Sequence, residues 1–367
     1  MSLSSQLQQG VLARWCATNL PGTGAVVDRI RAAAAPAPVL RPAGRVGAGH
    51  WPTVGGVVSA RLAALVQDAA PYAALYGLVA AEVVSAQASN AIAATYSAQR
   101  AVLAQEPDLT EVAVGLRPSP SDVVALLAPR PDTHGPRAGD TVFTELAQRG
   151  RVFHSSHAPT GTVGTHGAET ALARTYAAWT LGEDRYRSGT TPPALAHIVE
   201  TSAAPTVEQL RELAPQAVVE DTAALVRLGE SSGTLATWRG WAGDPRSGQT
   251  LGFASPVLVP HWAEADLLVG DTLVEVKTVL RADQPARIAR WVWQLLGYAW
   301  LDHGDRWQIR YLAFYLARHG VTVRWPVTEL EALLVGDPAR VPGVRAEFRR
   351  LTEQAAVSEG ATLLPMP

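Results

Sequence analysis

Lysine is nearly absent from this chain of 367 residues. Of its 31 lysines and arginines, only Lys277 is a lysine. A guanidinium is planar and always charged, whereas the lysine ammonium is a compact point charge whose pKa the surroundings tune. The single lysine therefore suggests a role that arginine does not fill, although coding bias with one random survivor would give the same composition.

Other features are also missing. Cys16 is the only cysteine, which excludes an internal disulfide, a cysteine-ligated zinc site and an iron–sulfur cluster. The sequence has no uncharged apolar run of about 18 residues and no basic segment followed by an apolar core at its start. No GxxxxGK[ST] phosphate loop is present, because Lys277 does not follow a glycine. We expect a cytoplasmic protein without membrane contact, in which any ATP-driven step comes from a partner.

Hydrophobic residues make up 47% of the chain and charged residues 17%, with a formal net charge of −2. This composition is typical of a globular protein, and the length allows two or three domains. There is no overall basic field, so contact with nucleic acid would require a local group of arginines.

The pattern of helical periodicity, Pro and Gly predicts three regions. Residues 1–135 are expected to form a mostly helical accessory domain, and residues 140–330 a mixed domain with a helical insertion at about 182–247. Residues 331–367 are expected to form a helical tail. The accessory domain either binds a partner, such as a helicase or ATPase, or positions DNA, or is a bundle whose role the sequence does not reveal.

Alternation of apolar and polar residues predicts the strands of the mixed domain. The expected strands are residues 251–260, 264–269, 272–278, 309–317 and 321–327. Gly270 and Asp271 separate the second and third strands, and glycine at the first central position suits a type II′ hairpin turn.

This hairpin predicts an unusual group of charges. With a two-residue turn, Asp266 lies opposite Glu275, and Lys277 follows on the same face opposite Glu264. Two opposed carboxylates must be solvated, share a proton or share a cation. The alternative is a solvent-facing polar edge with an ion pair between Lys277 and Glu264.

The predicted helix at residues 286–301 has two faces. An apolar stripe comprises Ile288, Val292, Leu295 and Ala299. A second stripe comprises Arg287, Arg290, Gln294 and Tyr298. This second stripe is either an ordinary polar face or a surface on which the two arginines bind a phosphate backbone.

Asp266, the Glu275-Val276-Lys277 segment, and Gln294 with Tyr298 four residues later resemble the RecB-type nucleases of the PD-(D/E)xK superfamily. The resemblance covers about a third of the chain, within residues 160–327, a size reasonable for one domain core. It implies an α/β (α+β) fold with a restriction-endonuclease-like core, a mixed sheet flanked by helices.

The resemblance also implies roles for individual residues. Asp266, Glu275 and the Val276 carbonyl would hold Mg²⁺ or Mn²⁺, while Lys277 acts on the attacking water. Gln294 and Tyr298 would orient the catalytic lysine or the DNA strand.

A fourth metal ligand would come from the start of the first helix of this domain. His166, three residues before Glu169, matches the family's histidine ligand, although a solvated or capping histidine fits the same position. His154 and His157 are a rival pair without nearby carboxylates.

The implied activity is metal-dependent hydrolysis of DNA phosphodiester bonds, with RNA not excluded, in DNA repair or antiviral (anti-phage) defence. Two other functions remain open. The chain could bind nucleic acid as a catalytically inactive subunit, or it could be a helical scaffold in which the polar hairpin face is incidental.

Overall fold

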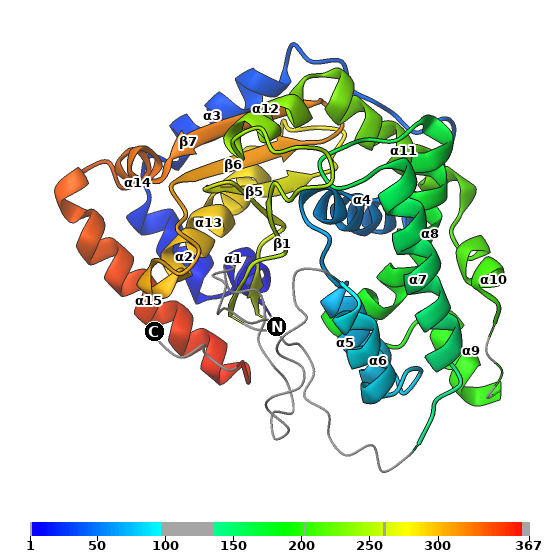
Figure 1. Cartoon of the computed structure of the whole chain (residues 1–367). Helices are drawn as coiled ribbons and strands as arrows, with labels where there is room; N and C mark the ends of the chain where they lie inside the picture. The colour runs from blue at the N-terminus through cyan, green and yellow to red at the C-terminus, as the bar shows by residue number, and fades with distance from the viewer. Residues whose placement is uncertain (1, 97–134, 202, 204, 260–261, 362–367) are drawn as a thin grey trace. The chain divides into compact units, whose positions relative to one another are not determined.

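The computed structural model describes residues 2–96, 135–201, 203, 205–259 and 262–361 (Figure 1). The fold is α+β and divides into two compact units. The sheet unit comprises Met1–Leu40, Ser232–Gly243 and Ser255–Pro367, and the helical unit comprises Arg41–Ser231 and Asp244–Ala254. These bounds differ from the predicted regions 1–135, 140–330 and 331–367. Pro120 and Ser121 also predict the start of a helix that runs from residue 122 to 127, and this segment lies outside the described residues.

Four strands of the mixed five-stranded sheet lie in the sheet unit, in the order β4-β5-β6-β7. They are β4 (Leu267–Val269), β5 (Thr272–Lys277), β6 (Tyr311–Leu316) and β7 (Val321–Pro326). β5 is antiparallel to β4 and parallel to β6, and β6 is antiparallel to β7. Parallel neighbours need a long crossover. Here the helix α13 (Pro285–Leu301) supplies it.

The predicted hairpin register is confirmed. Leu267 pairs with Val274, Leu268 with Leu273 and Val269 with Thr272. Gly270 has φ of 57°, the left-handed value that the first central residue of a type II′ turn requires. A Cβ atom at this position would lie 2.3 Å from the carbonyl oxygen of Trp241, so only glycine fits.

The strands before the hairpin differ from the prediction. Residues 251–260 do not form one strand, because Ser255 has φ of 52° and precedes a proline, which ends β1 (Gly252–Ala254) before β2 (Val257–Val259) begins. Residues 264–269 are also divided, since Glu264 belongs to β3 (Ala263–Glu264) and pairs with Val257 in a separate two-stranded sheet. The predicted position of Glu264 opposite Lys277 is therefore wrong.

Helices cover both faces of the sheet in the sheet unit (Figure 1). On one face lies α12 (Thr234–Trp241), whose Trp238 ring contacts Tyr315 with centroids 5.3 Å apart. On the other face lie α13 and α3 (Thr23–Ala34). Because successive side chains of a strand alternate between faces, Glu275 and Lys277 of β5 point to the α13 face.

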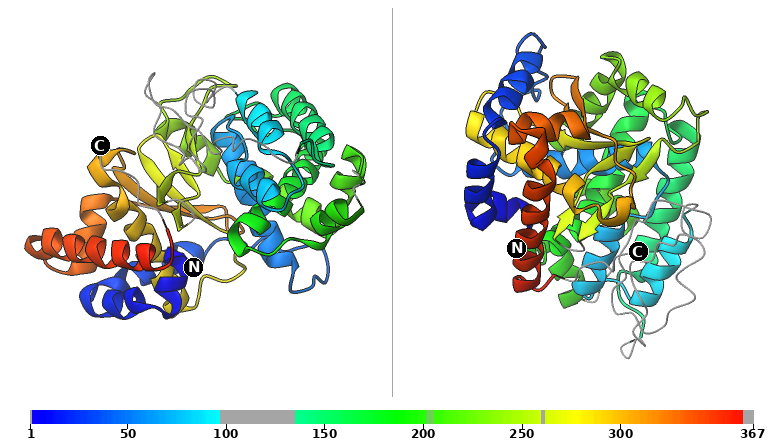
Figure 2. Two further views of the ribbon diagram at one scale, coloured as in Figure 1. Left: turned by 90° about the horizontal axis from the view of Figure 1, so that it is seen from below. Right: turned by 90° about the vertical axis from the view of Figure 1, so that its left-hand side faces the viewer.

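The two ends of the described chain pack together in the sheet unit, with the N-terminal and C-terminal helices side by side (Figure 2). Trp15 stacks on Phe348 at 5.5 Å, and the Leu3 amide donates to the Trp262 carbonyl. The N-terminal helices thus belong to the sheet unit and not to a separate accessory domain. The helices near the two ends are α1 (Leu3–Gln9), α2 (Val11–Asn19), α14 (Val327–Val335) and α15 (Val341–Ser358). The sheet unit also contains the 3₁₀ turns η2 (His303–Asp305) and η3 (Pro338–Arg340).

The helical unit is built around α8 (His166–Ser188). Two glycines let α5 and α8 approach closely, because a Cβ at Gly77 would lie 1.8 Å from the Gly182 carbonyl oxygen. The other helices are α4 (His50–Val66), α5 (Tyr72–Ala80), α6 (Ala86–Ala94), α7 (Asp140–His157), α9 (Pro193–Thr201), α10 (Val207–Glu212) and α11 (Gln216–Ser231). Within the described part of the chain, no helix has the length and apolar character that a membrane span needs.

Buried charges occupy the interior of the helical unit. Arg61 forms two hydrogen bonds of 2.8 Å to Glu169, and both side chains are fully buried. His154 on α7 is buried nearby, and its Nε2 atom has no hydrogen-bond partner among the described residues. Burial and, to a lesser extent, the charge of Arg61 lower the pKa of His154 to about 4, against the opposite effect of Asp68 and Glu169.

This buried histidine makes the stability of the helical unit depend on pH. Below its ordinary pKa of 6.5, His154 gains a proton in the unfolded chain but not in the folded one until about pH 4. We expect the free energy of unfolding to fall between pH 6.5 and 4 by up to about 3 kcal/mol more than in a His154→Leu variant. Urea unfolding of both proteins across this range measures the difference, and parallel pH profiles would contradict it.

Candidate functional site

The centre of the candidate site is an ion pair on β5. The Lys277 ammonium lies 2.7 Å from Oε1 of Glu275. The exposed fraction of the side chain is 6% for Glu275 and 15% for Lys277. The second carboxylate oxygen of Glu275, Oε2, is buried and has no hydrogen-bond partner in the part of the chain that the structure describes. The site therefore holds one acceptor whose bonding is incomplete, at a position shielded from water.

Gln294 links this ion pair to two helices. Its Oε1 accepts from the Lys277 ammonium at 3.4 Å, and its Nε2 donates to the Tyr298 hydroxyl at 2.7 Å. The same Nε2 lies 2.9 Å from Oγ of Ser4 on α1. Residues four apart on a helix share a face, which explains the contact of Gln294 with Tyr298. Sequence reasoning missed Ser4, because nothing local indicates that α1 reaches α13.

Two aromatic contacts complete the surroundings of Lys277. Its Nζ atom lies 5.6 Å from the ring centroid of Trp291, and the guanidinium of Arg287 lies 5.4 Å from the same ring. A cation near an aromatic face is attracted by the ring quadrupole. Arg287 and Lys277 therefore lie near the same buried tryptophan. Arg290, on the same helix, is half-buried. The role of Trp291 was also missed.

Asp266 lies beside β5, the strand that carries Glu275 and Lys277. Its Oδ2 atom accepts from the Val276 amide at 2.7 Å, and it directly precedes β4. The observed register ends at the pair of Leu267 with Val274, so the pairing of Asp266 with Glu275 stays a prediction, although the Asp266 side chain reaches β5. A residue in an extended strand directs its N–H and C=O to the same edge, so the Val276 carbonyl faces the edge that Asp266 occupies.

His166 and Glu169 have different surroundings. His166 is the first residue of α8 in the helical unit, half-exposed, with Nε2 3.3 Å from Oε2 of Glu220. Glu169 is buried against Arg61 and also accepts from the Gly164 amide at 2.7 Å. His166 therefore contacts Glu220, whereas Glu169 contacts Arg61 and Gly164.

The described residues do not include a complete metal centre. Across the residues that the structure describes, no group of three or more His, Cys, Asp and Glu side chains is arranged to hold a metal ion. Asp266 and Glu275 thus stand without a third side-chain ligand of these types.

Comparison of the chain with family models, with curated proteins and with solved structures finds no match.

The ion pair predicts energetic coupling between its members. Removing either charge leaves the other poorly compensated in a buried position, so Glu275→Gln and Lys277→Met should each destabilise the fold. We expect the double variant to be at least about 1 kcal/mol more stable than the sum of the single changes predicts. Urea unfolding of the four proteins measures this coupling.

The pair of Arg187 with Glu183 on α8, whose side chains are 53% and 23% exposed, is a less buried control. A double-mutant cycle of Glu183→Gln and Arg187→Met should give a coupling of about 0.3–0.5 kcal/mol. Equal coupling in the two cycles would contradict the assigned burial of the β5 pair.

Proposed function

We propose that this protein is a divalent-metal-dependent nuclease with a restriction-endonuclease-like core, hydrolysing phosphodiester bonds of DNA. The observation that carries the proposal is the state of Glu275. One oxygen of its buried carboxylate binds the only lysine of the chain, and the other has no hydrogen-bond partner among the residues that the structure describes. Asp266, which directly precedes β4, accepts a hydrogen bond from the Val276 amide between Glu275 and Lys277, so both acids and the lysine adjoin the same stretch of β5.

The residues present fit a hard divalent cation. Mg²⁺ binds through one or two carboxylates, and keeps several waters or substrate phosphate oxygens as its other ligands. Asp266, Glu275 and the Val276 carbonyl would hold it. The hydrogen bond from Val276 uses one of the several lone pairs of the Asp266 carboxylate. A third side-chain ligand is not required, and when bound the ion would lower the pKa of a water ligand and stabilise charge on phosphate.

The other residues of the site have roles that follow from their contacts. The Lys277 ammonium, held between Glu275 and Gln294, would position the attacking water and stabilise negative charge on the phosphoryl oxygens. Gln294, Tyr298 and Ser4 fix the direction of this ammonium. Arg287 and Arg290, one turn earlier on α13, would bind phosphates of the strand.

A second function is favoured by a specific observation. The described residues contain no group of three metal-ligating side chains, and His166 contacts Glu220. A nuclease-fold protein that binds nucleic acid without cutting, as a subunit of a larger complex, fits this incomplete ligand set. DNA repair and anti-phage defence are the settings that the resemblance suggests for either function.

Lys277→Arg tests the catalytic role of the single lysine. This substitution keeps the charge but replaces a point charge with a planar group, so we expect it to lose cleavage as completely as Lys277→Ala. Release of labelled fragments from linear and circular, single- and double-stranded DNA in Mg²⁺ and in Mn²⁺ is the measurement.

Arg350→Lys, an exposed substitution on α15, serves as the control and should cleave like the wild type. Substantial cleavage by Lys277→Arg would show that an arginine can replace the single lysine, and would contradict the proposed role of Lys277. Tight binding of DNA without cleavage by the wild type would support the binding subunit.

Metal stabilisation tests the ligand set independently of cleavage. A cation that binds only the folded state, at a concentration of 100 times its Kd, stabilises by about 2.7 kcal/mol. We expect Mn²⁺ to raise the melting temperature of the wild type, and Asp266→Asn and Glu275→Gln to abolish the rise. The scaffold alternative predicts no metal effect and an unchanged melting temperature for Asp266→Asn.

A further inference from the structure

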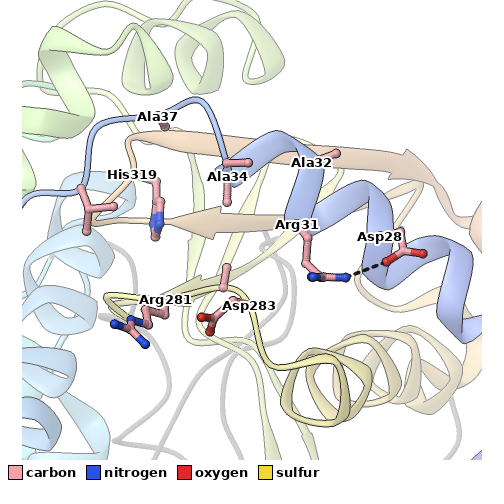
Figure 3. Close-up of a pocket in the computed structure, with 11 residues that line it drawn as sticks. Asp28, Arg31, Ala32, Ala34, Ala37, Arg281, Asp283 and His319 are labelled. Atoms are coloured by element: carbon pink, nitrogen blue, oxygen red, sulfur yellow. Dashed lines mark hydrogen bonds and ion pairs between the residues drawn. The ribbon is translucent and has the colours of Figure 1, made fainter.

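A pocket of about 490 Å³ opens in the sheet unit beyond the end of β5 (Figure 3). This volume falls within the range of roughly 300–1,000 Å³ for small-molecule sites. Three segments line it: α3 with the residues that follow it, the loop between β5 and α13, and the turn between β6 and β7. One side of the pocket is apolar and consists of Ala32, Ala34, Ala35, Ala37 and Val39.

The polar lining includes one buried group whose hydrogen bonding is incomplete. His319, in the β6–β7 turn, is 6% exposed, and its Nδ1 atom has no hydrogen-bond partner within the described ranges of the chain. Its side chain points toward the loop that carries Arg281 and Asp283 (Figure 3). Burial lowers the pKa of His319, so the ring is neutral at pH 7. A neutral imidazole offers a ligand one donor and one acceptor.

The charges at the mouth of the pocket are balanced. Arg31 and Asp28 form an ion pair at 3.0 Å. Arg281 and Asp283 are both exposed, and no hydrogen bond or ion pair is found for either among the residues that the structure describes. The pocket therefore offers one available cation and one available anion, a combination that disfavours a purely anionic ligand.

The pocket is close to the candidate site. The Lys277 carbonyl accepts from the Ala317 amide at 2.9 Å, two residues before His319. Arg281 follows Lys277 by four residues, so their Cα atoms are at most about 14 Å apart. The helix α3 also packs against α13, on the sheet face to which the Lys277 side chain points.

We propose that this pocket holds one unpaired base of the nucleic-acid strand, a base that carries an exocyclic amino group. Asp283 accepts from the amino group of adenine, cytosine or guanine, His319 binds a second polar atom of the base, and Arg281 binds the neighbouring phosphate. The alanine side packs against the ring. Thymine has no exocyclic amino group, and its one donor on the pairing edge, N3–H, is flanked by two carbonyl oxygens that would repel the Asp283 carboxylate.

This inference rests on the proposed function, because it takes the strand near Lys277 as the ligand, and it makes that function more specific. In a duplex the base is stacked between its neighbours and its pairing edge is covered by the complementary base, so it cannot enter the pocket and pack its ring against the alanines; the pocket therefore selects single-stranded or unpaired segments. Enzymes and binding proteins that read the pairing edge of a base require it to be outside a duplex.

The test measures binding of the full-length protein to labelled 12-mers in EDTA, where metal-dependent cleavage is prevented. One oligonucleotide is all thymine, and three others carry a single adenine, cytosine or guanine at the centre. We expect the substituted strands to bind about 10-fold more tightly than the all-thymine strand, within the range for a well-placed base contact. Annealing each strand to its complement should remove this preference.

Asp283→Ala should abolish the preference while leaving weak binding of all strands, and His319→Ala should reduce it. Glu347→Ala, an exposed acidic substitution on α15, is the matched control and should keep the preference. Equal affinity for all four strands in the wild type, or a preference that survives in Asp283→Ala, would overturn the proposal.

The same strands incubated with Mn²⁺ separate the two proposals. A base preference in EDTA without any cleavage in Mn²⁺ supports the pocket and argues against the nuclease. Equal binding of all four strands in EDTA, together with cleavage of all four at the same rate in Mn²⁺, would support the nuclease and overturn the proposed base pocket.

Discussion

The structure of the site depends on a carboxylate buried in the sheet. Glu275 lies on β5, between β4 and β6, where its negative charge requires a compensating cation. Lys277 supplies that cation from two residues away, and Gln294 holds the lysine from the neighbouring helix. Ser4 in turn lies against Gln294. A chain of contacts from the N-terminal helix to the central strand thus orients one ammonium group.

The topology brings these residues together from distant parts of the sequence. The crossover helix α13 lies on the face to which β5 directs Glu275 and Lys277, so its polar stripe meets them. The same crossover makes β5 and β6 parallel, which places the β6–β7 turn, with His319, beyond the end of β5. The candidate site on β5 and the pocket beyond the end of that strand are therefore neighbours. Both lie on the sheet face that α3 and α13 cover.

Local patterns were sufficient for the hairpin register, for α13 and for β6 and β7, because strand alternation, a glycine turn and helical spacing are properties of short segments. They failed at Ser255, where a left-handed residue before proline divides an apolar run. They also failed for Ser4 and Trp291, whose contacts arise from tertiary packing. The proposed metal ligand His166 rests on resemblance alone, and its observed contact is with Glu220.

If a divalent cation completes the bonding of Glu275, anomalous diffraction from a crystal grown with Mn²⁺ will locate it. We expect one strong peak about 2.0–2.2 Å from Oε2 of Glu275 and from a carboxylate oxygen of Asp266, since small divalent cations bind carboxylates at about this distance. A peak elsewhere with none at Glu275, or no peak at all at saturating Mn²⁺, would show that the carboxylate of Glu275 does not bind the metal.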